Sequence, residues 1–216
     1  MQIKNISGID YEKNSDDENF SKRIRHTYNE PTNFRQKILV DLYGNLIDKA
    51  SNVLEIGCGW GRNAQYFINE KHINYYSFDP SPTSLMYFKR LNLSSDRFYI
   101  SHDLDNKITS NKYDLIFSTF VLQHVGFLPG NTLVDDNTLD SESLTQTLLQ
   151  NLKVGGFWVS YESRCGQMGW NPDVWLKRIF ENNDNYKILN RDESPLDGSD
   201  EKREALHRLL VIQKIA

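Results

Sequence analysis

A glycine-rich turn constrains the fold of this chain more than any other part of its sequence. Residues 53–64 read VLEIGCGWGRNA, so a short apolar run ends in an acid and is followed by Gly57, Gly59 and Gly61. Glycine adopts positive φ values without strain and lets another molecule approach the backbone closely. The apolar run is typical of a buried strand, and the residues after the turn are typical of a helix. We therefore expect a helix N-terminus whose free N–H groups face a ligand.

The rest of the chain alternates between strand and helix patterns. Strands are expected at residues 52–56, 74–79, 97–101, 113–121 and 157–163, and helices at 32–46, 62–71, 81–91, 140–152 and 171–183. This alternation predicts an α/β fold with a doubly wound, mostly parallel sheet. Two further strand patterns, 186–191 and 206–215, are separated only by a polar loop. They are expected to form an antiparallel pair at one edge of a seven-stranded sheet.

Length and composition favour one domain. The 216 residues fit a single domain at 31–216, which follows a polar N-terminal arm at residues 1–30. The net charge of −4 argues against a nucleic-acid partner, since such proteins usually carry a basic excess. No apolar run reaches membrane-spanning length, so no membrane partner is expected. Two cysteines outside any Cys-x-x-Cys pair and the absence of a signal-like apolar region predict a cytoplasmic protein.

The glycine spacing separates the possible nucleotide ligands. A dinucleotide fingerprint, G-x-G-x-x-G, counted from Gly57 would need glycine where Arg62 stands. Counted from Gly59 it would end on Ala64, which the pattern permits, so a dinucleotide is disfavoured but stays open. A phosphate-binding loop of the Walker type is excluded because no Gly-Lys-Ser/Thr follows. The carboxylate of Glu55 would repel a pyrophosphate and favours a zwitterionic ligand.

The pattern Glu55-x-Gly57-x-Gly59-x-Gly61 resembles motif I of the class I S-adenosylmethionine-dependent methyltransferases. The resemblance covers residues 32–216 at the level of motifs and element order. Its other parts are SFDP with Asp79, SHDLD with Asp103, YDLIFSTFVLQHV with Asp114, Leu122 and His124, and LKVGG, where Val154 replaces the proline of the family's L-x-P-G-G turn. The late antiparallel strand pair also matches the family's sheet.

The resemblance implies S-adenosylmethionine as the cofactor. Glu55 and the glycines would hold its methionine end, Asp79 its ribose hydroxyls, and Asp103 with Leu104 its adenine. A carboxylate suits the ribose because it can accept both hydroxyl hydrogens. The full set of expected cofactor-binding residues is Glu55, Gly57, Gly59, Gly61, Asp79, Pro80, Asp103, Leu104, Phe120 and Arg35.

The acceptor side of the site is less specified. His124 follows the fourth expected parallel strand, where it is a candidate general base or, equally, a structural residue that bonds the backbone. The expected substrate-binding residues are Tyr161, Glu162, Arg164, Trp170 and Tyr28. For Tyr161, Glu162 and Arg164, a solvated strand end with a local ion pair is the simpler alternative. No metal site is expected, because the oxygen ligands at 135–137 are typical of a polar turn.

These patterns favour a methyltransferase that acts on the hydroxyl group of a small polar molecule, such as a sugar or other metabolite. Methylation of an amine or a protein side chain is the alternative reaction. Base-modifying DNA enzymes carry Asn/Asp-Pro-Pro-Tyr/Phe where this chain reads STFVLQHV, which disfavours a base as substrate. A non-catalytic binding module with the same fold and a dinucleotide oxidoreductase are the competing classes of protein. Neither the methyl acceptor nor the oligomeric state follows from the sequence.

Overall fold

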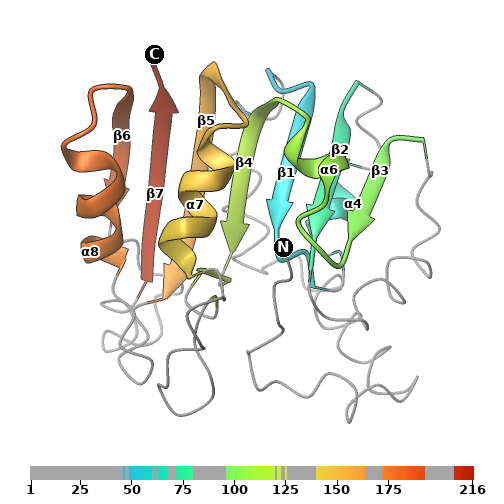
Figure 1. The fold of residues 1–216 in the computed structure, drawn as a ribbon, viewed down its shortest axis with the longest axis horizontal. Coiled ribbons are helices and arrows are strands. Elements are labelled where there is room, and N and C mark those ends of the chain that lie inside the picture. The colour runs from blue at the N-terminus through green and yellow to red at the C-terminus, as the bar shows by residue number, and fades with distance from the viewer. Residues whose placement is uncertain are drawn as a thin grey trace, which may run out of the picture.

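The computed structural model describes residues 46, 49–59, 61, 63–67, 72–79, 96–119, 121–122, 125, 140–163, 172–192 and 207–216. These residues form one seven-stranded sheet with helices on both faces (Figure 1). The strands are β1 (Asn52–Ile56), β2 (Asn74–Phe78), β3 (Phe98–Ser101), β4 (Tyr113–Thr119), β5 (Leu152–Ser163), β6 (Tyr186–Asp192) and β7 (His207–Lys214).

The strand order is β3-β2-β1-β4-β5-β7-β6, in which β1 to β5 run parallel and β7 runs antiparallel to both of its neighbours. This confirms the predicted doubly wound sheet and its antiparallel C-terminal pair. The order reverses between β1 and β4, because the chain leaves β1 for β2 on one side and returns to β4 on the other. In such sheets ligands bind beyond the carboxyl ends of the strands at this point. In Figure 1 these ends point downward.

Five helical segments are described. They are α4 (Ala64–Phe67), α6 (Asn106–Thr109), α7 (Ser141–Leu149), α8 (Pro172–Leu176) and the π-helical turn η4 (Lys177–Glu181). The carboxylates of Asp105 and Asp140 cap α6 and α7, accepting bonds from Ile108 N at 3.0 Å and Ser143 N at 2.7 Å. Helix α6 was not expected, because four residues are too few to show a helical period. The expected helix 81–91 lies outside the described residues, as does all of 32–46 except Leu46.

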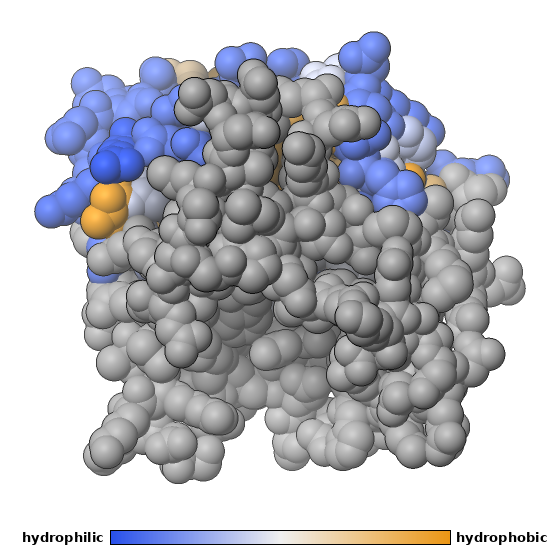
Figure 2. Space-filling view, turned by 60° about the horizontal axis from the view of Figure 1, so that its bottom comes forward, coloured by the Kyte–Doolittle hydropathy of each residue, from blue (hydrophilic) through white to orange (hydrophobic). Residues whose placement is uncertain are grey.

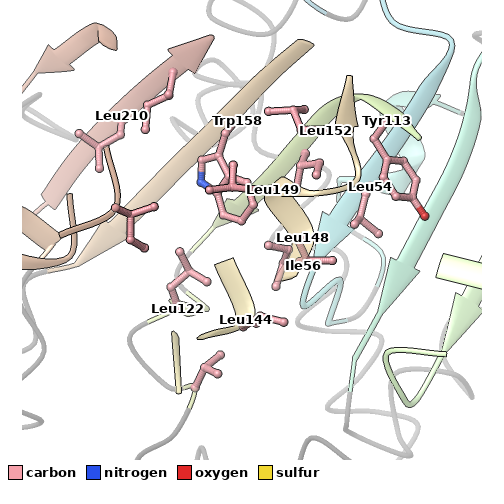
Figure 3. Close-up of a cluster of buried hydrophobic side chains, with 14 of the residues drawn as sticks. Leu54, Ile56, Tyr113, Leu122, Leu144, Leu148, Leu149, Leu152, Trp158 and Leu210 are labelled. Carbon is pink, nitrogen blue, oxygen red and sulfur yellow. The ribbon is translucent and has the colours of Figure 1, made fainter. Parts of the chain in front are cut away.

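The alternation of side chains along each strand divides the core into two clusters. Leu54 and Ile56 face α7, where they pack with Leu144, Leu148 and Trp158 (Figure 3). Val53 and Glu55, which alternate with them along β1, face the other side of the sheet. There Val53 belongs to a second cluster that includes Phe67 of α4 and Tyr75 of β2. Both faces of the parallel strands are therefore covered, which fixes the ends of the strands as the place for a site.

A turn was expected at residues 153–156, before the fifth parallel strand. The structure instead begins β5 at Leu152, which pairs with Tyr113, and the next pair joins Phe157 to Leu115. The intervening residues leave the ladder, and Gly155 has a φ of 84°. Val154 is exposed at this point. Figure 2 brings the bottom of Figure 1 toward the viewer, and the described residues that are visible lie toward the top of this view and are mostly hydrophilic.

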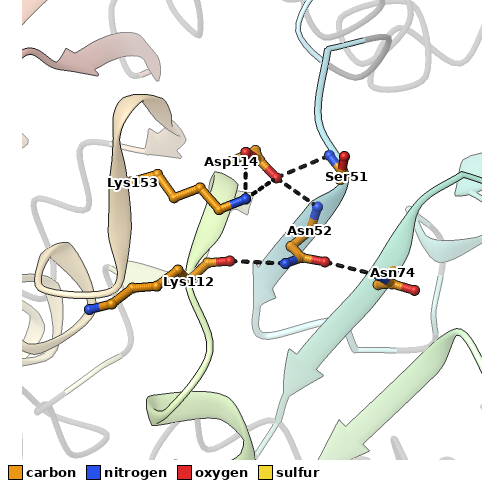
Figure 4. Close-up of polar contacts among 6 residues, drawn as sticks. All are labelled: Ser51, Asn52, Asn74, Lys112, Asp114 and Lys153. Atoms are coloured by element: carbon orange, nitrogen blue, oxygen red, sulfur yellow. Dashed lines mark hydrogen bonds and ion pairs between the residues drawn. The ribbon is translucent and has the colours of Figure 1, made fainter.

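Asp114 fixes the amino-terminal edge of the sheet (Figure 4). Its carboxylate accepts bonds from the successive N–H groups of Ser51 at 3.1 Å and Asn52 at 2.9 Å, and Lys153 Nζ lies 2.8 Å from its Oδ1. Burial raises the pKa of Asp114, but the bonds from Lys153 and the two N–H groups outweigh it and hold the pKa below its usual range. This motif residue therefore joins β4 to the start of β1, at the edge opposite the glycine turn.

Candidate functional site

The glycine turn leaves the carboxyl end of β1 with the backbone that only glycine adopts easily. Gly57, Gly59 and Gly61 have φ values of 68°, 51° and 76°. Gly57 N donates to the carbonyl of Phe78 at 2.9 Å, which ties the start of the turn to the end of β2. Among the described residues, no atom comes within 4 Å of the place where a Cβ on Gly59 would stand. The turn is therefore tied to β2 at Gly57, and at Gly59 it has an open side.

Asp79 lies beside this turn, directly after β2. Its Oδ2 accepts a hydrogen bond from Gly59 N at 2.7 Å. Its own N–H donates to the carbonyl of Ser101 at 2.9 Å, so the residue is also anchored to β3. The side chain is held with 9% of the residue exposed. A carboxylate can accept several hydrogen bonds, and the bond from Gly59 N orients the side chain of Asp79.

Glu55 lies beneath the turn, inside the protein, and is 2% exposed. The Tyr75 hydroxyl donates a hydrogen bond to its Oε2, and Asn63 Nδ2 donates to its Oε1 at 2.5 Å. A buried carboxylate needs such donors, because an unpaired charge is expensive to bury. Glu55 therefore joins β1 to β2 and to the residue before α4. The prediction that it holds the methionine end remains a prediction, and its described contacts are internal.

The two other titratable groups of this buried cluster, the Cys58 thiol and the Tyr75 hydroxyl, stay neutral at neutral pH. Burial raises the pKa of the Cys58 thiol well above its usual range, and the charges of Asp79 and Glu55 raise it further. The pKa of the Tyr75 hydroxyl is raised for the same reason, first by burial and then by Glu55. Cys58 is therefore a packed thiol and not a nucleophile, and Tyr75 stays a hydrogen-bond donor at neutral pH.

The adenine-side candidates follow β3. Asp103 is exposed, and its N–H donates to Ser101 Oγ at 3.2 Å. Leu104 is buried and belongs to the cluster on the α7 side of the sheet. The structure thus brings Asp103 to the same edge as Asp79 and Gly59, while Leu104 packs inward.

Two residues expected at the acceptor side lie inside the protein. Tyr161 and Glu162 are each 1% exposed, so the alternative of a solvated strand end is wrong for them, and their role in substrate binding stays a prediction. The carboxylate of Glu162 accepts bonds from Ser118 Oγ at 2.7 Å and from the N–H groups of Val121 at 2.9 Å and Leu122 at 3.2 Å. The sequence suggested an exposed pair because both residues stand at a strand end. The partners that draw Glu162 inward lie about 40 residues earlier in the chain.

Seven of the predicted site residues lie outside the described residues. These are Pro80, Phe120, Arg35, His124, Arg164, Trp170 and Tyr28. The polar stretch at 135–137 is also outside them. Within the described part of the chain, no group of three or more His, Cys, Asp or Glu side chains is placed to hold a metal ion. No helix among the described residues is long and apolar enough to cross a membrane.

The sequence missed the supporting residues Tyr75, Asn63 and Ser118. Tyr75 read as one aromatic of a buried strand, and nothing marked its hydroxyl as the partner of Glu55. A usable signal was the acid itself, because a Glu inside an apolar run must find donors on neighbouring strands.

Comparison with known proteins finds the same fold. A model of the methyltransferase domain family matches residues 54–157. Among solved structures, the plantazolicin methyltransferase BpumL in complex with SAH is similar over 94% of this chain and 92% of its own, at 12% identity and a TM-score of 0.61. The N-methyltransferase NodS from Bradyrhizobium japonicum WM9 in complex with S-adenosyl-L-homocysteine is similar over 90% of this chain and 97% of its own, at 17% identity and 0.62.

A third similar structure is the O-methyltransferase region of StiE. It covers 84% of this chain and 74% of its own length, at 14% identity and a TM-score of 0.59. No curated protein matches the chain by sequence. At these identities the structural likeness concerns the fold, and both O- and N-methyltransferases share it.

Proposed function

We propose that the chain is a class I S-adenosylmethionine-dependent methyltransferase and that it methylates a hydroxyl group of a small polar molecule. The proposed cofactor is S-adenosylmethionine. When bound, it supplies a methyl group activated by the positive charge of its sulfonium sulfur. The chain's own task is then to orient the cofactor and acceptor and to take up the acceptor's proton.

The observation that carries the cofactor site is the bond between Asp79 and Gly59. It holds a carboxylate at the open side of the glycine turn, next to the point where the strand order reverses. We propose that Asp79 accepts the ribose hydroxyls and that the turn binds the amino-acid end. The residues present fit such a cofactor, because a Cβ on Gly59 would enter open space beside an oriented acceptor. Asp103 at the same edge is the proposed adenine contact.

The proposal for the acceptor side is based on the positions of its residues in the sequence. His124 stands two positions after Leu122, whose N–H is held by Glu162. We assign His124 as the base that takes the proton from the acceptor hydroxyl, since an oxygen nucleophile at neutral pH gains from losing it. The net charge of −4 favours a small molecule over a nucleic acid. Arg35, Pro80 and Phe120 on the cofactor, and Tyr28, Arg164 and Trp170 on the acceptor, complete the proposal.

The alternative is methylation of a small amine or a protein side chain. The likeness to the N-methyltransferase NodS supports it as directly as the likeness to the StiE O-methyltransferase supports oxygen. A non-catalytic binding module is a third possibility. A non-catalytic module of this fold can lose the glycines or the acid after the second strand, and this chain has kept both.

Product release separates these reactions. The protein is incubated with S-adenosylmethionine and sugars, sugar nucleotides, phenols, amines or peptides, and formation of S-adenosylhomocysteine is measured. Turnover with a hydroxyl compound is the expected result. Turnover only with amines or peptides would replace the proposal by its alternative, and no turnover with any of these acceptors would favour the binding module.

The role of His124 is tested on the accepted substrate. His124→Asn should lower turnover by about 100-fold or more while the affinity for S-adenosylhomocysteine stays within about twofold. The matched control is His72→Asn, because His72 is exposed and precedes β2 at the opposite edge of the sheet. Unchanged turnover in His124→Asn would remove the base role.

A further inference from the structure

Glu162, one of the residues expected to bind substrate, is a buried carboxylate. It stands near the end of β5 and is 1% exposed. Both of its oxygens are bound to the neighbouring strand β4 and the residues that follow it. Oε1 accepts from Ser118 Oγ at 2.7 Å, and Oε2 accepts from Val121 N at 2.9 Å and Leu122 N at 3.2 Å. It therefore holds two successive backbone N–H groups at the point where the chain leaves β4.

Val121 connects this bond to the glycine turn. Its two Cγ atoms lie 2.6 Å from the place where a Cβ on Gly57 would stand, so its side chain fills the space beside that glycine. Gly57 in turn begins the turn that ends in the Gly59–Asp79 bond. β1 and β4 are the strands between which the strand order reverses, so this contact lies across the reversal point.

We infer that Glu162 is a positioning residue for the cofactor, which acts through Val121 on the glycine turn. By holding the N–H groups of Val121 and Leu122, it fixes the Val121 side chain against Gly57 and so fixes the open side of the turn. The same bond sets the start of the segment that leads to His124. This inference rests on the proposed cofactor site, because it assigns the support of that site and not a new ligand.

A second carboxylate with the same kind of hydrogen bonds, at the opposite edge of the sheet, provides a matched control. Asp114 also accepts hydrogen bonds from two successive N–H groups, those of Ser51 and Asn52. It lies at the amino-terminal edge, away from the glycine turn. Loss of either carboxylate frees two backbone donors, but only the loss of Glu162 would disturb Val121.

The test measures the affinity for S-adenosylhomocysteine by calorimetry in four variants, at a temperature where all of them are folded. Glu162→Ala should weaken binding by about tenfold, whereas Asp114→Ala should leave it within about twofold. Glu162→Gln should restore most of the affinity. Its amide oxygen can accept from both N–H groups and its NH2 group can donate to Ser118 Oγ, so the geometry survives without the charge.

The fourth variant, Val121→Ala, cuts the link to Gly57 without touching the carboxylate. It should weaken binding by about three- to tenfold, and it decides the question if Glu162→Ala does not fold. Wild-type affinity in Glu162→Ala, or in Val121→Ala when the first variant is unfolded, would overturn the inference. Equal losses in Glu162→Ala and Asp114→Ala would overturn it as well, because the effect would then be one of general stability. If the wild type does not bind S-adenosylhomocysteine, the cofactor site itself is wrong, and the inference falls with it.

Discussion

The Tyr75 hydroxyl donates a hydrogen bond to the carboxylate of Glu55 in the interior of the protein, directly under the glycine turn. This bond joins neighbouring strands, since Tyr75 lies on β2 and Glu55 on β1. Asn63 supplies the second described donor to the same carboxylate. The turn thus rests on a buried polar cluster, and weakening that cluster should affect the stability of the whole domain.

Tyr75→Phe should lower the free energy of unfolding by about 1–3 kcal/mol, because it removes a donor from a buried carboxylate and leaves the ring packing intact. Urea unfolding followed by circular dichroism measures this change. Tyr76→Phe is the control, since Tyr76 is the next residue on β2 and faces the other core cluster. Equal stability of the two variants would contradict the role given to the bond.

Alkaline pH should destabilise the protein in a way that depends on Tyr75. Burial, and then the charge of Glu55, raise the pKa of Tyr75 above its usual value of 10.0 in the folded state. Because the pKa of Tyr75 is higher in the folded than in the unfolded state, its neutral hydroxyl contributes fully to stability below pH 10. This contribution is lost as the pH rises beyond 10. Each such group lowers the unfolding free energy by up to about 1.4 kcal/mol per pH unit above that point.

The measurement compares urea midpoints of wild type and Tyr75→Phe between pH 8 and pH 11. The wild type should lose its stability advantage as pH rises, so that the two curves converge. Tyr113 and Tyr186 have pKa values raised by burial as well, so both proteins should still decline. Parallel curves over the whole range would show that Tyr75 is not the group that titrates.

Gly57 and Gly59 should respond differently to alanine. Alanine at either position places a side chain at positive φ, which costs about 1–2 kcal/mol. At Gly57 the new methyl would also meet Val121 Cγ atoms at 2.6 Å, and such overpacking adds about 1–3 kcal/mol. Gly57→Ala should therefore be the less stable protein, while Gly59→Ala should fold and lose cofactor affinity.

The double variant Gly57→Ala/Val121→Ala checks the cause. If the clash with Val121 is responsible, Gly57→Ala should lower the unfolding free energy less in the Val121→Ala background than in the wild type. The coupling energy from this double-mutant cycle should be about 1–3 kcal/mol. Additive losses would place the strain in the backbone alone.

The fold followed from the sequence where local pattern and residue type decide the structure. The apolar runs, the alternation of strands and helices, and glycines that must have positive φ specified β1 to β5 and the turn between β1 and α4. Asp79 could be placed for the same reason, because a residue directly after β2 must lie at the edge where β1 ends. Helix α6 was not predicted, because its one strong sequence signal, the N-cap Asp105, precedes only four helical residues.

The buried carboxylates could not be predicted to the same degree. Glu162 stands at a strand end, where a polar residue is usually solvated, and it is buried because Val121 and Leu122 offer it their N–H groups. Glu55 was expected to face a ligand and is held by Tyr75, twenty residues further along the chain. In both cases the deciding partners lie 20 or more residues away, on a neighbouring strand or directly after one. The order of residues alone does not show which donors the fold brings close to a carboxylate.

The central claim is that Asp79, oriented by Gly59, holds S-adenosylmethionine in the glycine turn. Calorimetric titration with S-adenosylhomocysteine tests it in wild type and in Asp79→Asn, whose amide oxygen can still accept the Gly59 N–H. The wild type should bind and should show no heat with NAD, and Asp79→Asn should bind about tenfold more weakly or worse. Binding of NAD in place of S-adenosylhomocysteine, or equal affinity in the two proteins, would contradict the claim.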